Sequence, residues 1–135
     1  MLSPRFRRCW RLANHYANRA IGFLMYLWDL EAGKDLPTIR EKFERRGAEL
    51  NAIIQRLVEE GCIDWEGAEA GWKAVEAILR DGRAGRRVRR ETLAQLAEPV
   101  RRFADRAGGE PPSPLTGDYV GVLLAFAKFL REEGE

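Results

Sequence analysis

One long helix is predicted by residues 3–33, SPRFRRCWRLANHYANRAIGFLMYLWDLEAG, and the rest of the fold is organised around it. Ser3 and Pro4 form a typical helix start, and Gly33 is a typical stop. Between them, apolar side chains recur at steps of three and four, so they fall on one side of a helix. These residues are Phe6, Trp10, Ala13, Ala17, Ala20, Ile21, Leu24, Leu27 and Trp28. The spacing predicts a helix over 4–32.

The opposite side of this helix changes character halfway along. Its first half carries cations at helical spacing, namely Arg5, Arg8, Arg11, His15 and Arg19. Its second half is apolar on that side as well, with Gly22, Phe23, Met25, Tyr26 and Leu30. We therefore expect a helix that is exposed and cationic at its start and surrounded by protein at its end.

Residues 37–60 predict a second helix that begins at Pro37 and keeps its apolar period through Gly47. The same segment also resembles the helix, turn and recognition helix of a winged-helix DNA-binding protein, with its turn at Gly47. We favour one helix, because a turn would break the period and the proposed recognition helix is too acidic for phosphate. Within a helix, Gly47→Ala would be tolerated or would stabilise by up to about 1 kcal/mol if a methyl group fits.

Three more helices are predicted over 65–80, 89–107 and 118–133. Asp64 is a cap for the first of them, which is expected to end at Asp81 and Gly82. In that helix Trp65 and Trp72 fall on the apolar side, where tryptophans are more often core residues than a stacking platform. Pro99 should kink or split the helix over 89–107, because proline removes a backbone hydrogen bond.

Two linking segments have distinct compositions. Residues 82–90, GRAGRRVRR, read as a flexible basic loop with almost nothing to bury, and residues 108–117, GGEPPSPLTG, as a glycine- and proline-rich connector. The last helix is apolar on nearly every side, so we expect it to be buried against several neighbours. The predicted fold is all-α, a single-domain bundle of about five helices over 1–135.

Charge is segregated along the chain although its net value is only +2. Arginines account for 19 of the 23 basic residues and concentrate in 1–20 and 80–106, whereas residues 27–76 carry twelve acids against seven bases. Cys9 and Cys62 are too few for a disulfide framework, so we expect two reduced, buried thiols. Without a membrane-span pattern or a signal-peptide pattern, we expect a cytoplasmic protein with no membrane contact.

The sequence does not predict an enzyme. His15 is the only histidine, and it falls in the arginine row, where a surface role or a phosphate contact is favoured over catalysis. Metal binding would have to join Cys9, His15 and Cys62 from distant positions, and no glycine-rich phosphate loop occurs. We expect no cofactor, no metal and no small-molecule substrate.

The remaining candidate site is cationic. A rigid arginine row beside a flexible arginine loop suits contact with a nucleic-acid backbone, without base reading. The candidate nucleic-acid-binding residues are Arg5, Arg8, Arg11, Arg19, Arg83, Arg86, Arg87, Arg89, Arg90, Arg101, Arg102 and Arg106. The alternative is a solvated charged surface that the acidic middle of the chain neutralises.

The outline resembles a known family. An apolar, glycine-containing stretch in the first helix (residues 20–24, AIGFL), a basic middle and a Phe- and Leu-rich final helix entered by Asp118-Tyr119-Val120 are similar to the helical small subunit of CRISPR effector complexes of the Cascade type. The resemblance covers most of the chain in arrangement only. It implies a non-enzymatic subunit present in several copies, with basic residues on the nucleic-acid backbone and helix faces on neighbouring subunits. The acidic stretch over 29–76 departs from that pattern.

The function predicted on this basis is that of a structural subunit of a ribonucleoprotein. It would bind RNA or single-stranded DNA through its arginine clusters without sequence specificity, and it would contact other protein subunits, copies of itself included, through helix faces. The alternative is a helical protein-interaction or regulatory module, or a divergent winged-helix DNA-binding protein.

Overall fold

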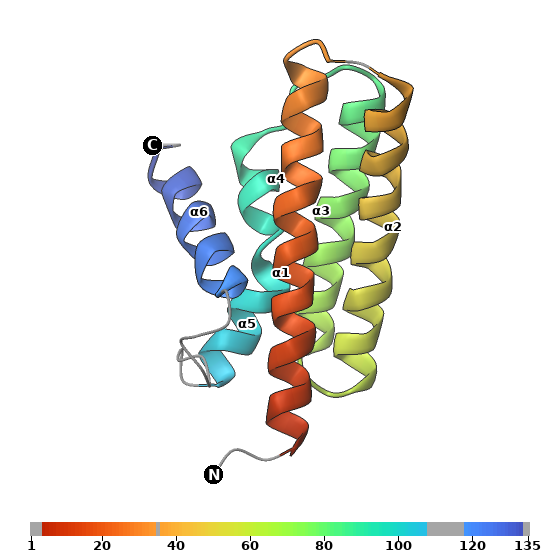
Figure 1. Ribbon diagram of the computed structural model, residues 1–135. Coiled ribbons are helices and arrows are strands. Elements are labelled where there is room, and N and C mark those ends of the chain that lie inside the picture. The colour runs from red at the N-terminus through yellow and green to blue at the C-terminus, as the bar shows by residue number, and fades with distance from the viewer. Residues whose placement is uncertain (1–3, 35, 108–117, 134–135) are drawn as a thin grey trace.

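The computed structural model describes residues 4–34, 36–107 and 118–133, which contain six helices (Figure 1). They are α1 (Pro4–Glu31), α2 (Pro37–Glu59), α3 (Trp65–Arg83), α4 (Arg90–Gln95), α5 (Glu98–Arg106) and α6 (Tyr119–Glu133). These described residues contain no strand, so the predicted all-α fold is confirmed. The Ser3 cap and the 108–117 connector lie outside the described residues.

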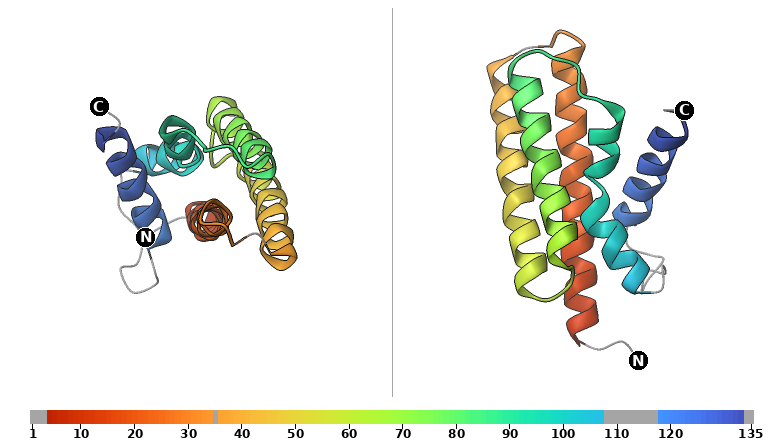
Figure 2. Two further views of the ribbon diagram at one scale, coloured as in Figure 1. Left: turned by 90° about the horizontal axis from the view of Figure 1, so that it is seen from above. Right: turned by 180° about the vertical axis from the view of Figure 1, so that it is seen from behind.

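α1 is the central element of the bundle. Viewed from above, it lies between the α2–α3 pair on one side and α4, α5 and α6 on the other (Figure 2). Ala13, Ala17 and Ala20 are completely buried on α1, and such small side chains let neighbouring helices approach closely. Tyr16 is buried as well, and its hydroxyl donates a 2.6 Å hydrogen bond to the carbonyl of Leu96, which ties α1 to the turn after α4.

The local signals at helix ends and breaks are largely confirmed. Asp64 accepts a 2.8 Å hydrogen bond from the Gly67 amide and caps α3. Asp118 caps α6 in the same way. The predicted helix over 89–107 is split into α4 and α5, and Pro99 is the second residue of α5, where a missing N–H costs nothing.

Gly47 lies inside the uninterrupted helix α2, and its φ is not positive. The helix-turn-helix alternative for residues 36–63 is therefore excluded. The predicted end of the third helix at Gly82 is wrong, because Gly82 is buried within α3 and the helix continues to Arg83. The residue with a positive φ that follows is Gly85, at 70°.

The expectation that Trp65 lies in the core is wrong. Its side chain is 63% exposed and meets the half-buried Trp72 edge to face, with ring centroids 5.4 Å apart. The side of α3 that contacts the core instead combines Val75 and Ile78 with small residues, and a Cβ at Gly71 would lie 2.6 Å from Cγ of Pro99. Trp65 is thus left in water, whereas Trp72 stays half-buried against the core.

The last helix is not buried on every side. Val120, Leu123, Ala127 and Leu130 pack into the core, whereas Val122 and Phe129 are more than half exposed. The second half of α1 also departs from expectation, because Met25 is 57% exposed. The loop after α3 was expected to bury almost nothing, but Val88 within it is buried.

The cysteines are not free thiols. Cys9 and Cys62 form a disulfide that links the start of α1 to the turn between α2 and α3, across 53 residues of sequence. Both residues are buried, and their Cα atoms are 5.4 Å apart, within the range that a disulfide needs. Two cysteines without local spacing gave no sign of this pairing, which depends on how α1 crosses the α2–α3 turn.

Candidate nucleic-acid interface

The twelve candidate arginines do not form one surface. Four of them lie along the first half of α1, whereas the α3–α4 loop lies at the far end of α1 (Figure 1). α1 has 28 residues, so these two groups are separated along a helix about 42 Å long. The remaining arginines are on α5, near the start of α1.

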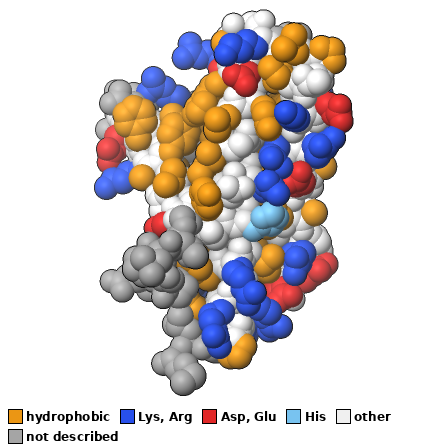
Figure 3. Space-filling model, viewed as in Figure 1, with side chains coloured by type: hydrophobic (Ala, Val, Ile, Leu, Met, Phe, Trp, Pro, Cys, Tyr) orange, Lys and Arg blue, Asp and Glu red, His pale blue; other side chains and the backbone are white. Residues whose placement is uncertain are grey.

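The first half of α1 and the facing side of α2 enclose an open hollow with a volume of about 440 Å³. We call it the basic groove, and it is lined by Arg8, Arg11, Leu12, His15, Arg56 and Glu60. Figure 3 shows basic side chains along this side of the molecule. The groove thus brings together two predicted arginines with one, Arg56, that the sequence analysis did not select.

Acidic residues neutralise only part of the groove. Arg8 is 3.6 Å from Glu60, whereas neither Arg11 nor Arg56 has a carboxylate partner within the described residues. At the upper end of the row, Arg19 is 2.9 Å from Glu49, although its N–H is not aligned for a hydrogen bond. The groove keeps at least two uncompensated guanidinium groups.

His15 lies exposed between these arginines. Partial burial lowers its pKa, and the positive charges of Arg19 and Arg56 lower it further, while Glu49 opposes them. The pKa of His15 thus lies below its ordinary value, so the imidazole adds less positive charge to the groove than an unperturbed histidine would.

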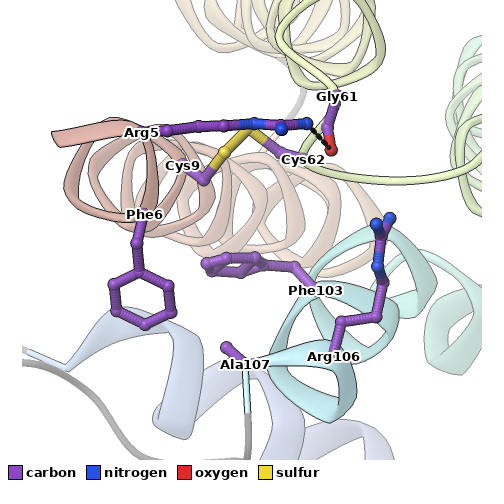
Figure 4. Close-up of a pocket in the computed structure, with 8 residues that line it drawn as sticks. All are labelled: Arg5, Phe6, Cys9, Gly61, Cys62, Phe103, Arg106 and Ala107. Carbon is purple, nitrogen blue, oxygen red and sulfur yellow. Dashed lines mark hydrogen bonds between the residues drawn. A yellow bond between two sulfur atoms is a disulfide. The ribbon is translucent and has the colours of Figure 1, made fainter. Parts of the chain in front are cut away.

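A second, smaller pocket of about 230 Å³ lies over the disulfide at the start of α1 (Figure 4). Arg5 and Arg106 both line it, so the structure brings together two predicted arginines from opposite parts of the chain. Arg5 donates a 3.2 Å hydrogen bond to the carbonyl of Gly61. Arg106 has no carboxylate partner among the described residues.

The arginines around the α3–α4 loop are of two kinds. Arg83 donates a 2.6 Å hydrogen bond to Glu44, and Arg86 a 3.2 Å hydrogen bond to Asp81. Three others are exposed and have no carboxylate partner in the described part of the chain, namely Arg87, Arg89 and Arg90.

On α5, Arg101 and Arg102 are occupied by acidic side chains. Arg101 donates a 2.9 Å hydrogen bond to Glu98 and also binds Asp105. Arg102 bridges Asp64 and Glu66 at the start of α3, with both distances 2.9 Å. Arg102 thus joins α5 to α3, whereas both partners of Arg101 lie on α5 itself. These two arginines are the least available to a phosphate.

Six of the twelve predicted arginines are therefore ion-paired within the described residues. For these six, the structure agrees with the alternative in which acidic residues of the chain neutralise the arginines. Sequence reasoning missed Arg56, which lies on the side of α2 that faces α1. The apolar period predicts which side of a helix is buried. It does not predict which of the residues bordering that side lie next to another helix.

No family model, curated protein or solved structure matches this chain. Within the described residues, no group of three or more His, Cys, Asp or Glu side chains is placed to hold a metal ion. None of the described helices is both long enough and apolar enough to cross a membrane.

Proposed function

We propose that this protein is a non-enzymatic structural subunit that binds the backbone of RNA or single-stranded DNA without sequence specificity. The observation that carries the proposal is the basic groove, in which Arg11 and Arg56 face solvent without a carboxylate partner in the described chain. A guanidinium fork suits phosphate oxygens, and contacts with phosphates position a nucleic-acid backbone without reading its sequence.

The unpaired arginines of the α3–α4 loop form a second contact in this proposal. They lie at the opposite end of α1, so one strand that touches both regions has to run along the bundle. The resemblance to a small subunit of CRISPR effector complexes supplies the setting, a ribonucleoprotein in which neighbouring protein subunits cover the helix faces.

A cytoplasmic location belongs to the proposal, and the disulfide is the observation that bears against it. Disulfides are rare in cytosols that thioredoxin and glutathione keep reduced, and they persist in oxidising compartments. Alkylation of free thiols in the native cells, followed by mass spectrometry of the chain, tests this point. An oxidised Cys9–Cys62 pair would contradict a reducing cytoplasm.

The test of nucleic-acid binding is its salt dependence. Arg8→Gln, Arg11→Gln and Arg56→Gln together should weaken binding of a single-stranded oligonucleotide of any sequence, and should flatten the log–log salt slope by about two units, at ~0.7 to 0.9 per phosphate contact. A matched triple variant outside the groove, Lys73→Gln, Arg80→Gln and Arg131→Gln, removes the same charge from exposed positions and should change the slope far less. Equal slopes for the two triples would contradict a specific role for the groove.

The second candidate function is a helical protein-interaction module. It is favoured by the exposed apolar residues of α1 and α6 and by the six arginines that are already ion-paired. If the parent chain shows no salt-dependent binding to single strands, duplexes or hybrids, this candidate replaces the first.

A further inference from the structure

Exposed large apolar side chains gather in one region of the molecule. Seven such residues are strongly exposed in the described chain, and five of them lie on the second half of α1 and on α6. They are Met25 and Trp28 on α1, and Tyr119, Val122 and Phe129 on α6. We call this surface the apolar face. Figure 3 shows hydrophobic side chains gathered over α6 and the neighbouring part of α1.

The apolar face has the spacing of an unpartnered helix-packing surface. Val122, Phe126 and Phe129 follow one another at four and three residues along α6, the steps of a coiled-coil seam. Met25 and Trp28 repeat the step of three on α1. Trp28 and Phe126 meet edge to face with ring centroids 5.5 Å apart, so the two rows are joined across the helices.

The area of this face matches what a protein interface needs. Its five residues are each about half exposed, and large apolar side chains present ~150 to 250 Å² each, which leaves roughly 500 Å² of apolar surface in water. Monomeric proteins rarely expose a larger patch. Two such faces together remove about 1,000 Å² before their polar rims are counted, which is the lower bound for a specific interface.

The charged residues around the apolar face indicate what kind of partner it binds. On α6 it carries Lys128 and Glu132, and beside the end of α1 it carries Asp29 and Lys34, in pairs with nitrogen–oxygen distances of 3.9 Å. A rim of both signs does not attract a phosphate backbone, and it does not repel an identical rim. The basic groove, in contrast, would repel a second basic groove.

The shape of the face also complements itself. Next to the projecting Val122 and Phe129, α6 presents Gly121 and the exposed Ala125, one turn apart. Bulky and small side chains on one surface supply both the knobs and the holes of a two-fold symmetric contact, in which the same patch is used by both copies.

We propose that the apolar face binds a second copy of this chain, so that α1 and α6 of the two copies form a two-fold symmetric dimer. The dimer would be one of the protein–protein contacts that the proposed function requires. The inference rests on that part of the proposed function, and it does not depend on nucleic-acid binding. The basic groove lies on the α2 side of α1 and stays open in such a dimer.

The test is the mass of the full chain in solution without nucleic acid, measured by light scattering from about 1 to about 100 µM. The parent should approach twice its 15.4 kDa mass. Val122→Glu with Phe129→Glu should weaken dimerisation at least ~100-fold, because two charges then enter the apolar contact. The matched control is Leu36→Glu with Trp65→Glu, two exposed apolar residues outside the apolar face, which should leave the dimer intact.

Each outcome decides the proposal. A parent that stays at 15.4 kDa throughout, a Val122→Glu and Phe129→Glu variant that dimerises like the parent, or a control pair that dissociates equally would overturn it. If the α6 variant loses helicity, Met25→Glu on α1 tests the same face from the other helix and must give the same loss. A monomeric result would leave the salt dependence of the basic groove unaffected, so the two proposals fail separately.

Discussion

The two sides of α1 are held in different ways. Toward α2, the helix is joined by the Cys9–Cys62 disulfide, by ion pairs and by the stacked rings of Phe23 and Phe43, with centroids 4.9 Å apart. Toward α6, it meets one buried row of side chains and leaves a second apolar row in water. One helix thus gains its stability mainly on its α2 side and presents a binding surface on its α6 side.

The largest effect should come from the disulfide on the α2 side. Replacing Cys9 and Cys62 by Ala removes a cross-link between residues 53 apart, which the chain-entropy relation values at about 4 kcal/mol. Urea unfolding of the variant, and of the parent with a reducing agent, should show similar losses. An unchanged midpoint on full reduction would mean that packing alone holds the start of α1.

The two rows of α6 should respond differently to truncation. Leu123→Ala removes a buried side chain and should cost about 2 to 5 kcal/mol, whereas Phe129→Ala removes an exposed one and should change stability by less than ~0.5 kcal/mol in the monomer. Phe126 is half-buried, so Phe126→Ala should cost less than the ~3 to 5 kcal/mol of a fully buried phenylalanine. Equal costs at 123 and 129 would remove the distinction between the rows.

Packing on the α2 side should also reverse the expectation for Gly47→Ala. The sequence predicts tolerance if a methyl group fits, but a Cβ at Gly47 would lie 2.9 Å from both terminal carbons of Leu79. Overpacking of this kind should cost about 1 to 3 kcal/mol. Leu79→Ala in the same chain makes room, so the double variant should lose less than the sum of the two single changes; additive losses would exclude this contact as the cause.

The smallest effect concerns acid stability on the α5 side. Hydrogen bonds from Arg101 lower the pKa of Glu98 below its ordinary 4.5, and the charges of Arg101 and Arg102 lower it further. Because the folded pKa is depressed, this contribution to stability is present above pH 4.5 and is lost as the pH falls through the folded pKa. Glu98→Gln should therefore flatten the decline of the melting temperature below pH 4.5, while Glu91→Gln, an exposed carboxyl without an ion pair in the described chain, should not.

The sequence by itself determined the features that depend on neighbours along the chain. The period of α1, the cap Asp64, the break at Pro99 and the continuity of α2 through Gly47 are set by backbone hydrogen bonding and by side-chain spacing within one helix. These rules predicted the all-α class and most helix bounds to within a few residues, and they identified Arg5, Arg8 and Arg11 as exposed, whereas Arg19 is partly buried against α2.

Only the tertiary structure decided which sides of the helices meet. Apolar periodicity is read from large side chains, so it predicted that Trp65 lies in the core. In the structure, α3 instead approaches its neighbours closely at Gly71. It could not show that Arg56 faces α1, that Cys9 reaches Cys62, or that half of α6 stays in water. Each of these depends on distances between segments that are far apart in sequence. Such distances are set by how closely whole helices pack, and the sequence of a single helix does not determine that.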